Sequence, residues 1–535
     1  MTLIEGSNIT IGHLGIVAGM FDKLEIGTYI DEELAKTRHH HISHGTAVKA
    51  LTLNGLGYTE SRLSLVSEFY EDIATERLLG VEVRSEHLNE YALGETLDAI
   101  AAYGPTRLFT GIVLRMMKKM PPMEIQRLHH DTTSINVTGD YDNESRTRLI
   151  EIVRGHSKDH RDDLKQFVIS LVTNQHGIPV FMAPLSGNKS DKKSLLKSIQ
   201  AVRENLVTDQ KIYHMADSAF YTEDNIRNLG RQCHWISHVP LTITEAKILV
   251  SSEITWTASK DKRYKYAIYE SSYGAIPQKW ALFHSAEQQN RVNATFRTRL
   301  ERQLKKDKTA LKKLCSKGFA CEPDARAVID RWFRKNSHYQ IDNLTITPEH
   351  RRQAGKRGRP TKNEICDVIH LPSCEFSLDE DWVLTEQDRA GRFILACNDT
   401  GIDPESMLEY YKEQNAVERG FRFIKDKRFH VSEVYLKNEN RIAALSMLMV
   451  LCLLIYSVAE WWFRKILKEQ KATVMNPRKK PTSNPSMKRV FFLFRRVRQV
   501  LEIVDENVHC HVLNVNDEIK QILRMFGQEF EKYYL

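Results

Sequence analysis

The chain has 535 residues, which at about 150 residues per domain predicts three or four domains. Hydrophobic residues make up 41% and charged residues 27% of the chain, which excludes fibrous, collagen-like and wholly disordered proteins. Lys and Arg outnumber Asp and Glu by 77 to 69, and the formal net charge of +8 favours a polyanionic partner without requiring one.

The cysteines and the N-terminus indicate the compartment. The eight cysteines include no CxxC pair, so neither a disulfide framework nor a zinc ribbon is indicated. The N-terminus lacks the basic start and the small-residue cleavage site of a signal peptide. Both observations predict a cytoplasmic protein.

In chain order, residues 1 to about 120 are predicted to be helical, with Ser43 as a helix N-cap. From Leu128 the pattern changes to short β-prone runs that alternate with helical ones. We expect strands at Ile135–Val137, Phe167–Val172, Ile178–Met182, Lys211–Met215 and His234–Val239, with helices at Lys192–Val202 and Thr222–Leu229. This β-β-β-α-β-α-β order predicts a mixed α/β core.

The stretch from Pro240 to Arg389 does not continue this alternation and is predicted to be an insertion. It contains strand-like pieces, a charged helical stretch at Ala286–Leu314 and a basic loop, Lys356–Pro360. The core is expected to resume with a strand at Arg392–Cys397 and a long helix from Pro404 to about Lys427.

Two later segments stand out by charge. Ile442–Ala459 has eighteen residues without a charge, which is nearly enough to cross a bilayer as a helix. A single span of borderline length between soluble segments is better explained as a helix buried against a sheet. The segment Lys471–Arg498 contains no Asp or Glu. It begins with Lys471 and has eight more Lys and Arg residues, which predicts a local basic patch.

The helix around Glu418 carries a polar stripe. Tyr411, Gln414, Glu418 and Lys425 are spaced by three, four and seven residues, which places them on one helical face. Taken alone, this stripe is better explained as a solvated face with an ordinary Glu to Lys pairing.

Two aspartates favour a site instead. Asp131 is placed at the start of a predicted strand, where Asp is disfavoured, and Asp217 at the C-terminal end of the fourth strand, where ligand sites of α/β sheets form. Each alone has an explanation as a turn cap.

Together with Glu418 these aspartates supply the oxygen ligands that Mg²⁺ or Mn²⁺ requires. Two such ions, three carboxylates and one phosphodiester would be close to neutral, which predicts a two-metal site for in-line phosphoryl transfer.

The order Asp131, Asp217, Glu418, with a long insertion before the Glu, resembles the DDE transposases of bacterial insertion sequences of the IS-four group. Their helix signature is a tyrosine, two residues, arginine, three residues, glutamate, six residues and lysine. Tyr411, Glu418 and Lys425 match it, and Gln414 replaces the arginine. The segments Gly155–Gln166 and Pro184–Asn188 are also similar.

The resemblance implies a ribonuclease H-like mixed sheet flanked by helices, with catalytic and metal-binding roles for Asp131, Asp217 and Glu418. It also implies DNA contacts, by Tyr411, Gln414, Arg422, Lys425, Lys158, His160, Lys165 and Trp280. In related enzymes a tryptophan of the insertion stacks on a flipped base, which would point to Trp256 or Trp280. We favour the alternative, in which each tryptophan fills the core of the insertion.

The domains implied are a helical DNA-binding domain at 1–120, core parts at 121–240 and 391–465, an insertion domain at 241–390, and a basic helical C-terminal region at 466–535.

The function implied is magnesium-dependent endonuclease cleavage and strand transfer during DNA transposition and recombination. The partners would be double-stranded DNA, as element inverted repeats and target, and a second copy of the chain in a homodimer on DNA. The protein would work in the bacterial cytosol at the nucleoid, with no membrane attachment. The alternatives are a ribonuclease H-like nuclease without strand transfer and a catalytically inactive DNA-binding protein.

Overall fold

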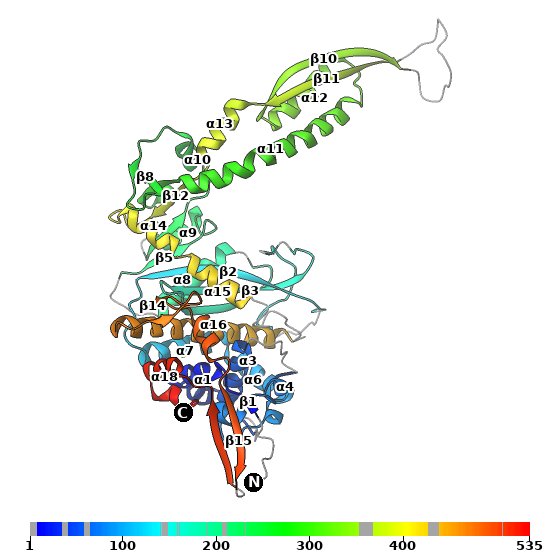
Figure 1. Cartoon of the computed structure of the whole chain (residues 1–535). Coiled ribbons are helices and arrows are strands. Elements are labelled where there is room, and N and C mark those ends of the chain that lie inside the picture. The colour runs from blue at the N-terminus through cyan, green and yellow to red at the C-terminus, as the bar shows by residue number, and fades with distance from the viewer. Residues whose placement is uncertain are drawn as a thin grey trace. The chain divides into compact units, whose positions relative to one another are not determined.

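In this computed structural model of the chain, the structure describes residues 8–34, 41–57, 65–139, 141, 148–157, 159, 161–189, 191–205, 211–230, 232–351, 367–425, 438–504 and 507–535. The chain divides into two compact units (Figure 1). The first unit comprises residues 1–237, 272–278 and 397–535, and the second comprises 238–271 and 279–396.

The N-terminal part of the first unit is helical, as predicted. Its elements are β1 (Asn8–Thr10), α1 (Leu14–Lys23), α2 (Ile26–Glu33), α3 (His44–Leu56), α4 (Val66–Phe69), α5 (Thr75–Leu79), η2 (Ser85–Leu88), α6 (Glu90–Tyr103) and α7 (Pro105–Lys119). The Ser43 side chain accepts a hydrogen bond from the Thr46 N–H at 3.0 Å, so the predicted N-cap is confirmed.

Helix α16 (Glu439–Glu469) is the centre of the first unit. Among the described residues it is the one helix long and apolar enough to cross a membrane, yet 83% of its most apolar window is buried. It packs against α3, α6 and α7 and also against the sheet strand β4 (Pro179–Ser186). The prediction of a helix buried against a sheet is therefore confirmed.

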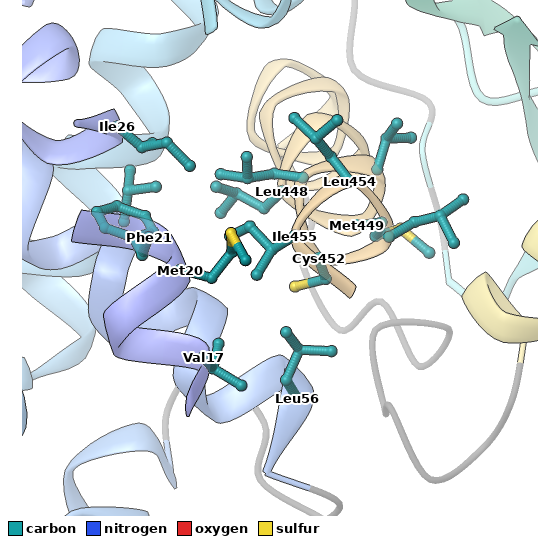
Figure 2. Packing of buried hydrophobic residues seen from close by; sticks show 14 of the residues in the cluster. Val17, Met20, Phe21, Ile26, Leu56, Leu448, Met449, Cys452, Leu454 and Ile455 are labelled. Carbon is teal, nitrogen blue, oxygen red and sulfur yellow. The ribbon is translucent and has the colours of Figure 1, made fainter. Parts of the chain in front are cut away.

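The packing around α16 explains its composition. Met20 and Phe21 of α1 face Leu448 and Ile455 of α16 across a fully apolar interface (Figure 2). Each such side chain, once fully buried, contributes about 1.5–3 kcal/mol. One cluster of buried residues runs from the N-terminal helices through the sheet to the C-terminus, so these segments share a single core.

The sheet of the first unit has the strand order β4-β3-β2-β5-β6. Its other strands are β2 (Arg127–Val137), β3 (Lys165–Asn174), β5 (Tyr213–Ala216) and β6 (His234–His238). The pairs β2–β3 and β3–β4 are antiparallel, whereas β2–β5 and β5–β6 are parallel.

Helices cover this sheet, which confirms the predicted ribonuclease H-like mixed fold. They include α8 (Asp191–Asn205), which packs on β2, β3 and β4, and α15 (Asn415–Ile424), which packs on β2 and β3. Helices α9 (Glu223–Leu229) and α14 (Pro404–Lys412) complete the described elements of this core.

The C-terminal region differs from its purely helical prediction because it also contains strands. Its elements are β13 (Val474–Met475), β14 (Pro481–Thr482), α17 (Met487–Phe494), β15 (Arg498–Val504), β16 (Asn507–Leu513), α18 (Asp517–Phe526) and α19 (Gln528–Glu531). Strand β15 pairs with both β16 and the N-terminal strand β1, so the two ends of the chain share one small sheet.

The second unit contains α10 (Thr244–Ser251), β7 (Thr257–Ala258), β8 (Tyr264–Ser271), β9 (Gln278–Ser285), α11 (Ala286–Cys315), α12 (Glu322–Lys335), β10 (Tyr339–Arg351), β11 (Asp367–Leu378), α13 (Glu380–Arg389) and β12 (Arg392–Cys397). The short helix η3 (Tyr273–Ala275) lies in the first unit. Strands β10 and β11 form a long antiparallel pair (Figure 1), and a small aromatic core joins them to α11 and α12.

Candidate active site

The parallel pairing of β2 with β5 brings the two aspartates to equivalent positions. Its last paired residues are His129 and Met215, and Asp131 and Asp217 each follow two residues later. Side chains alternate along a strand with a period of two, so Asp131 lies on the same face of β2 as His129. Asp217 directly follows Ala216, the last residue of β5. Neighbouring strands are about 4.8 Å apart.

The surroundings of the two aspartates differ slightly from the prediction. Asp217 directly follows β5, as expected, but Asp131 lies within β2, because that strand begins at Arg127 and not beside the aspartate. Both side chains are partly buried. The Oδ1 atom of Asp131 accepts from the Thr132 N–H at 2.7 Å, and that of Asp217 accepts from the Ala219 N–H at 3.0 Å.

A buried histidine pair lies between the same two strands, and sequence reasoning missed it. His130 Nε2 lies 2.9 Å from His214 Nδ1, and His130 Nδ1 lies 2.9 Å from the Ser198 hydroxyl on α8. Burial lowers the pKa of His214 to about 3 and holds the pKa of His130 well below its usual range. The signal was the triplet His129-His130-Asp131, in which alternation puts His130 on the opposite face from Asp131.

The predicted single helix from Pro404 to about Lys427 is wrong, because α14 ends at Lys412 and α15 begins at Asn415. The join keeps a right-handed helical backbone but is tightened. The Gln414 N–H donates to the Tyr411 carbonyl at 3.1 Å, three residues back and not four.

An ion pair explains where the helix breaks. Glu413, in the join, lies 2.7 Å from the Arg127 guanidinium at the start of β2, and 3.7 Å from the ring of buried His129. The join is thereby held against the strand that carries Asp131. Sequence reasoning missed Glu413, since nothing in the local pattern distinguishes it from the solvated Glu409.

Tyr411 lies near enough to Asp217 and Glu418 for both charges to act on it. Burial raises the pKa of the Tyr411 phenol, and the negative charges of Asp217 and Glu418 raise it further. The phenol therefore lies in the electrostatic field of both carboxylates. Glu418 itself is exposed on α15, next to buried Val417.

The three carboxylates do not converge into a preformed metal site in this structure. Among the described residues, no group of three or more His, Cys, Asp or Glu side chains is close enough to hold a metal ion. The oxygen-only donors nonetheless fit the chemistry of a hard divalent cation. Two of them, Asp131 and Asp217, come from adjacent strand positions, and Glu418 comes from a helix that packs on β2.

The residues predicted to contact DNA fall into different settings. Lys425 follows α15, and its ammonium group donates to both Asp159 oxygens at 2.8 and 2.9 Å. Gln414 stands at the N-cap of α15, Arg422 is exposed on the same helix, and Lys165 opens β3. Lys158 and His160 lie outside the described residues.

The tryptophans of the second unit are not equivalent. Trp280 is 1% exposed in β9, so in this structure its ring is not accessible for stacking on a base. Trp280 therefore fills the core of the insertion, which was the alternative role predicted for it. Trp256 is half-buried, with its ring 5.6 Å from His284 and the Arg392 guanidinium 5.7 Å away.

Comparison with known families accounts for most of the chain. The family model described as "Transposase DDE domain" matches residues 123–455, and a domain of unknown function (DUF4277) matches residues 7–114. A comparison with curated proteins found no match. The transposase match covers more than half of the chain and includes β2, β5, α14, α15 and α16. The chain therefore belongs to the family of DDE-domain transposases.

Proposed function

We propose that this protein is the transposase of a bacterial insertion sequence of the IS-four group. It would cleave DNA at the ends of the element and join the ends to target DNA. Its partners would be double-stranded DNA and a second copy of the chain, because two element ends must be brought together. The observation that carries the proposal is the register of β2 and β5, which brings Asp131 and Asp217 to equivalent positions on neighbouring strands.

Asp131, Asp217 and Glu418 are the proposed metal ligands, with two Mg²⁺ or Mn²⁺ ions as the bound group. Members of this family use divalent metals. When bound, such ions activate a water or a 3′-hydroxyl and stabilise the leaving oxygen. The carboxylates supply the matching negative charge, and Glu418 would complete the set from an exposed position on α15.

The other residues of the site would hold the DNA backbone. The pKa of the Tyr411 phenol lies above its usual value of 10, so the phenol is protonated at neutral pH and its O–H can donate to a phosphate oxygen. Lys425 would exchange its bond to Asp159 for a phosphate. Both interactions position the strand, because contacts to phosphate carry no sequence information. The contacts assigned to Arg422, Gln414, Lys165, Lys158 and His160 are proposals of the same kind.

Strand transfer tests this function. Purified protein with Mg²⁺, a pre-cleaved element end bearing a 3′-hydroxyl, and supercoiled target DNA should yield covalently joined product. The Asp131→Asn variant should lose joining while DNA binding is kept, and the exposed Asp163→Asn variant should keep both. Hydrolysis without joining would assign the protein as a nuclease, and unchanged activity in Asp131→Asn would refute the proposed site.

A further inference from the structure

A cavity of about 720 Å³ lies in the first unit, and its lining residues do not include Asp131, Asp217 or Glu418. It is bordered by the residues between β1 and α1, by α4 with the turn after it, and by α17. Neither the proposed catalytic chemistry nor the DNA contacts described above involve these residues. The basic segment Lys471–Arg498, which includes α17, likewise has no role so far.

Aromatic rings form much of the cavity wall. Phe69 of α4 and Phe491 of α17 are buried, and Phe491 stacks on the His13 ring at a centroid distance of 4.5 Å. Phe492 also lines the cavity but is 50% exposed. The Arg495 guanidinium lies 3.5 Å from the centre of the Phe492 ring, and that of Arg489 lies 5.6 Å from it. Both guanidinium groups therefore lie within cation–π distance of the Phe492 ring, which stays half exposed. An exposed aromatic ring beside arginines is a surface on which a nucleobase can stack.

The charged residues of the cavity have opposite signs on different elements. Lys488 and Arg495 come from α17, within a segment that has no Asp or Glu from 471 to 498. Glu68 and Asp72 come from α4 and the turn after it, and both are exposed. A simple anion would be attracted by the first pair and repelled by the second.

One class of ligand could bind the basic pair, the acidic pair and the aromatic residues of the cavity together. A nucleotide carries phosphate for Lys488 and Arg495, a flat ring for the aromatic residues, and in adenine, cytosine and guanine an amino group. Carboxylates such as Glu68 and Asp72 accept hydrogen bonds from that amino group, as Glu and Asp do from cytosine N4. Thymine presents a carbonyl oxygen at the equivalent position, which a carboxylate repels.

We infer that this cavity binds an unpaired nucleotide of a DNA strand, with the base beside Phe492, its amino group on Glu68 and Asp72, and its phosphate on Lys488 and Arg495. The identification of DNA as the source of the nucleotide rests on the proposed function. The site is separate from Asp131, Asp217 and Glu418, so strand binding here does not require metal.

The test measures binding of fluorescent oligonucleotides to the full chain in EDTA, which removes catalysis from the readout. The wild-type protein should bind an oligo-dC strand more tightly than oligo-dT of equal length. Phe492→Ala should weaken oligo-dC binding by about tenfold, as expected for one lost stacking contact, and should weaken blunt duplex binding much less. Met475→Ala is the matched control, because Met475 is exposed in the same basic segment but does not line the cavity.

A second variant tests the carboxylates. Glu68→Gln with Asp72→Asn should abolish the preference for oligo-dC over oligo-dT while melting temperature stays unchanged. Equal affinity for both strands in the wild type, or equal losses on single strands and duplex in Phe492→Ala, would overturn the inference. Tight binding of free dCMP without binding of oligo-dC would also overturn it. A protein that joins DNA ends but shows no Phe492 effect refutes this site alone, whereas selective strand binding without joining refutes only the proposed function.

Discussion

At the scale of single residues, the Lys425 ammonium group is bonded to the carboxylate of Asp159 when no DNA is bound. Asp159 accepts two hydrogen bonds from it, and Asp159 also accepts from the Asn136 amide at 3.5 Å. A phosphate that binds Lys425 must displace this carboxylate. The pair is partly exposed, so its contribution is about 0.2–1 kcal/mol.

Replacing Asp159 with Asn should therefore tighten binding of element-end DNA by about two- to fivefold, because a competing anion is lost. Fluorescence anisotropy at constant salt measures the change. Asp163→Asn is the control, since Asp163 pairs with Arg161 in the same segment. Weaker binding by Asp159→Asn would mean that Asp159 positions Lys425 for DNA and does not compete with it.

The buried His130–His214 pair predicts how stability depends on pH. Burial lowers the pKa of His214 from 6.5 to about 3, so the unfolded state binds more protons between these values. The stability linked to His214 is complete above about pH 6.5 and is lost as pH falls towards 3. The slope is at most about 1.4 kcal/mol per pH unit for each histidine.

Denaturant unfolding between pH 4 and pH 8 should show this loss. The His214→Gln variant should be less stable at pH 8 but should have a shallower slope below pH 6.5. His509→Gln, at an exposed position on β16, should keep the wild-type slope. A His214→Gln slope equal to that of the wild type would show that other groups cause the acid sensitivity.

At the scale of elements, the join between α14 and α15 controls where Glu418 lies. Glu413→Gln removes the charge that pairs with Arg127, whose side chain is only 16% exposed. We expect destabilisation of about 1–3 kcal/mol and a larger loss of strand transfer than of DNA affinity, because α15 loses its anchor on β2. Joining kinetics and DNA binding measured on Glu413→Gln and on exposed Glu409→Gln separate the effects. Equal losses of joining and binding in Glu413→Gln would contradict a positioning role.

The contact between α1 and the C-terminus depends on two glycines. A Cβ atom at Gly15 would lie 2.6 Å from the Tyr534 ring, and one at Gly19 would lie 2.6 Å from the Phe530 ring. The Tyr534 hydroxyl also accepts from the Ile16 N–H at 3.0 Å and donates to the Gly12 carbonyl at 2.8 Å. These rings therefore sit directly on the helix backbone.

Gly15→Ala should destabilise the protein by about 1–3 kcal/mol because Tyr534 must move. Helix propensity alone predicts the opposite sign, a gain of about 1 kcal/mol, so the sign of the change in unfolding free energy decides between the two. Gly401→Ala is the control, since its nearest neighbour would be the Asp399 side chain at 3.4 Å.

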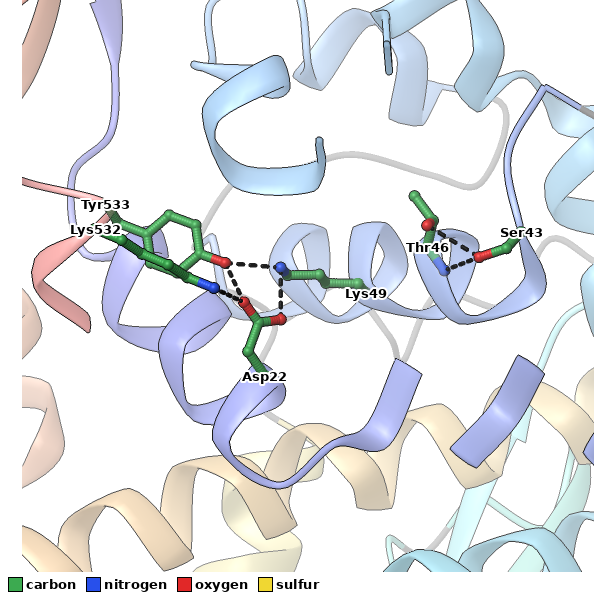
Figure 3. Close-up of polar contacts among 6 residues, drawn as sticks. All are labelled: Asp22, Ser43, Thr46, Lys49, Lys532 and Tyr533. Carbon is green, nitrogen blue, oxygen red and sulfur yellow. Dashed lines mark hydrogen bonds and ion pairs between the residues drawn. The ribbon is translucent and has the colours of Figure 1, made fainter. Parts of the chain in front are cut away.

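At the scale of the whole molecule, the N-terminal helices and the C-terminus belong to one folding unit. Asp22 of α1 lies 2.7 Å from both Lys49 of α3 and Lys532 near the C-terminus, and Tyr533 donates to it as well (Figure 3). The Lys49 side chain is 11% exposed, so this ion pair is largely desolvated. Together with the shared core, it ties residues at both ends of the chain.

The fragment 1–120 should consequently not fold alone, although a separate family model covers residues 7–114. Its α1 and α3 would expose the surfaces that α16 covers in the full chain. Circular dichroism and amide proton dispersion of the fragment, compared with the full chain, measure this. A cooperative unfolding transition in the isolated fragment would contradict the prediction.

The sequence by itself determined the local elements and the chemical class of the site. Ser43 caps α3 because its hydroxyl needs only the N–H three residues on, and the β-prone runs became β2, β3 and β4 because alternation and branched side chains act locally. Asp217 at the end of β5 was also accessible to this reasoning. The residue types of Asp131, Asp217 and Glu418 predicted oxygen ligands for a divalent metal ion.

The tertiary structure alone decided what depends on residues far apart in the chain. The break before Asn415 requires Arg127 to reach Glu413, and the burial of Trp280 requires the packing of the second unit. The docking of Tyr534 on α1 joins residues 518 apart in sequence. Sequence patterns reflect the conformational preferences of nearby residues only. Burial and ion pairing depend instead on which distant segment packs against a residue in the folded chain.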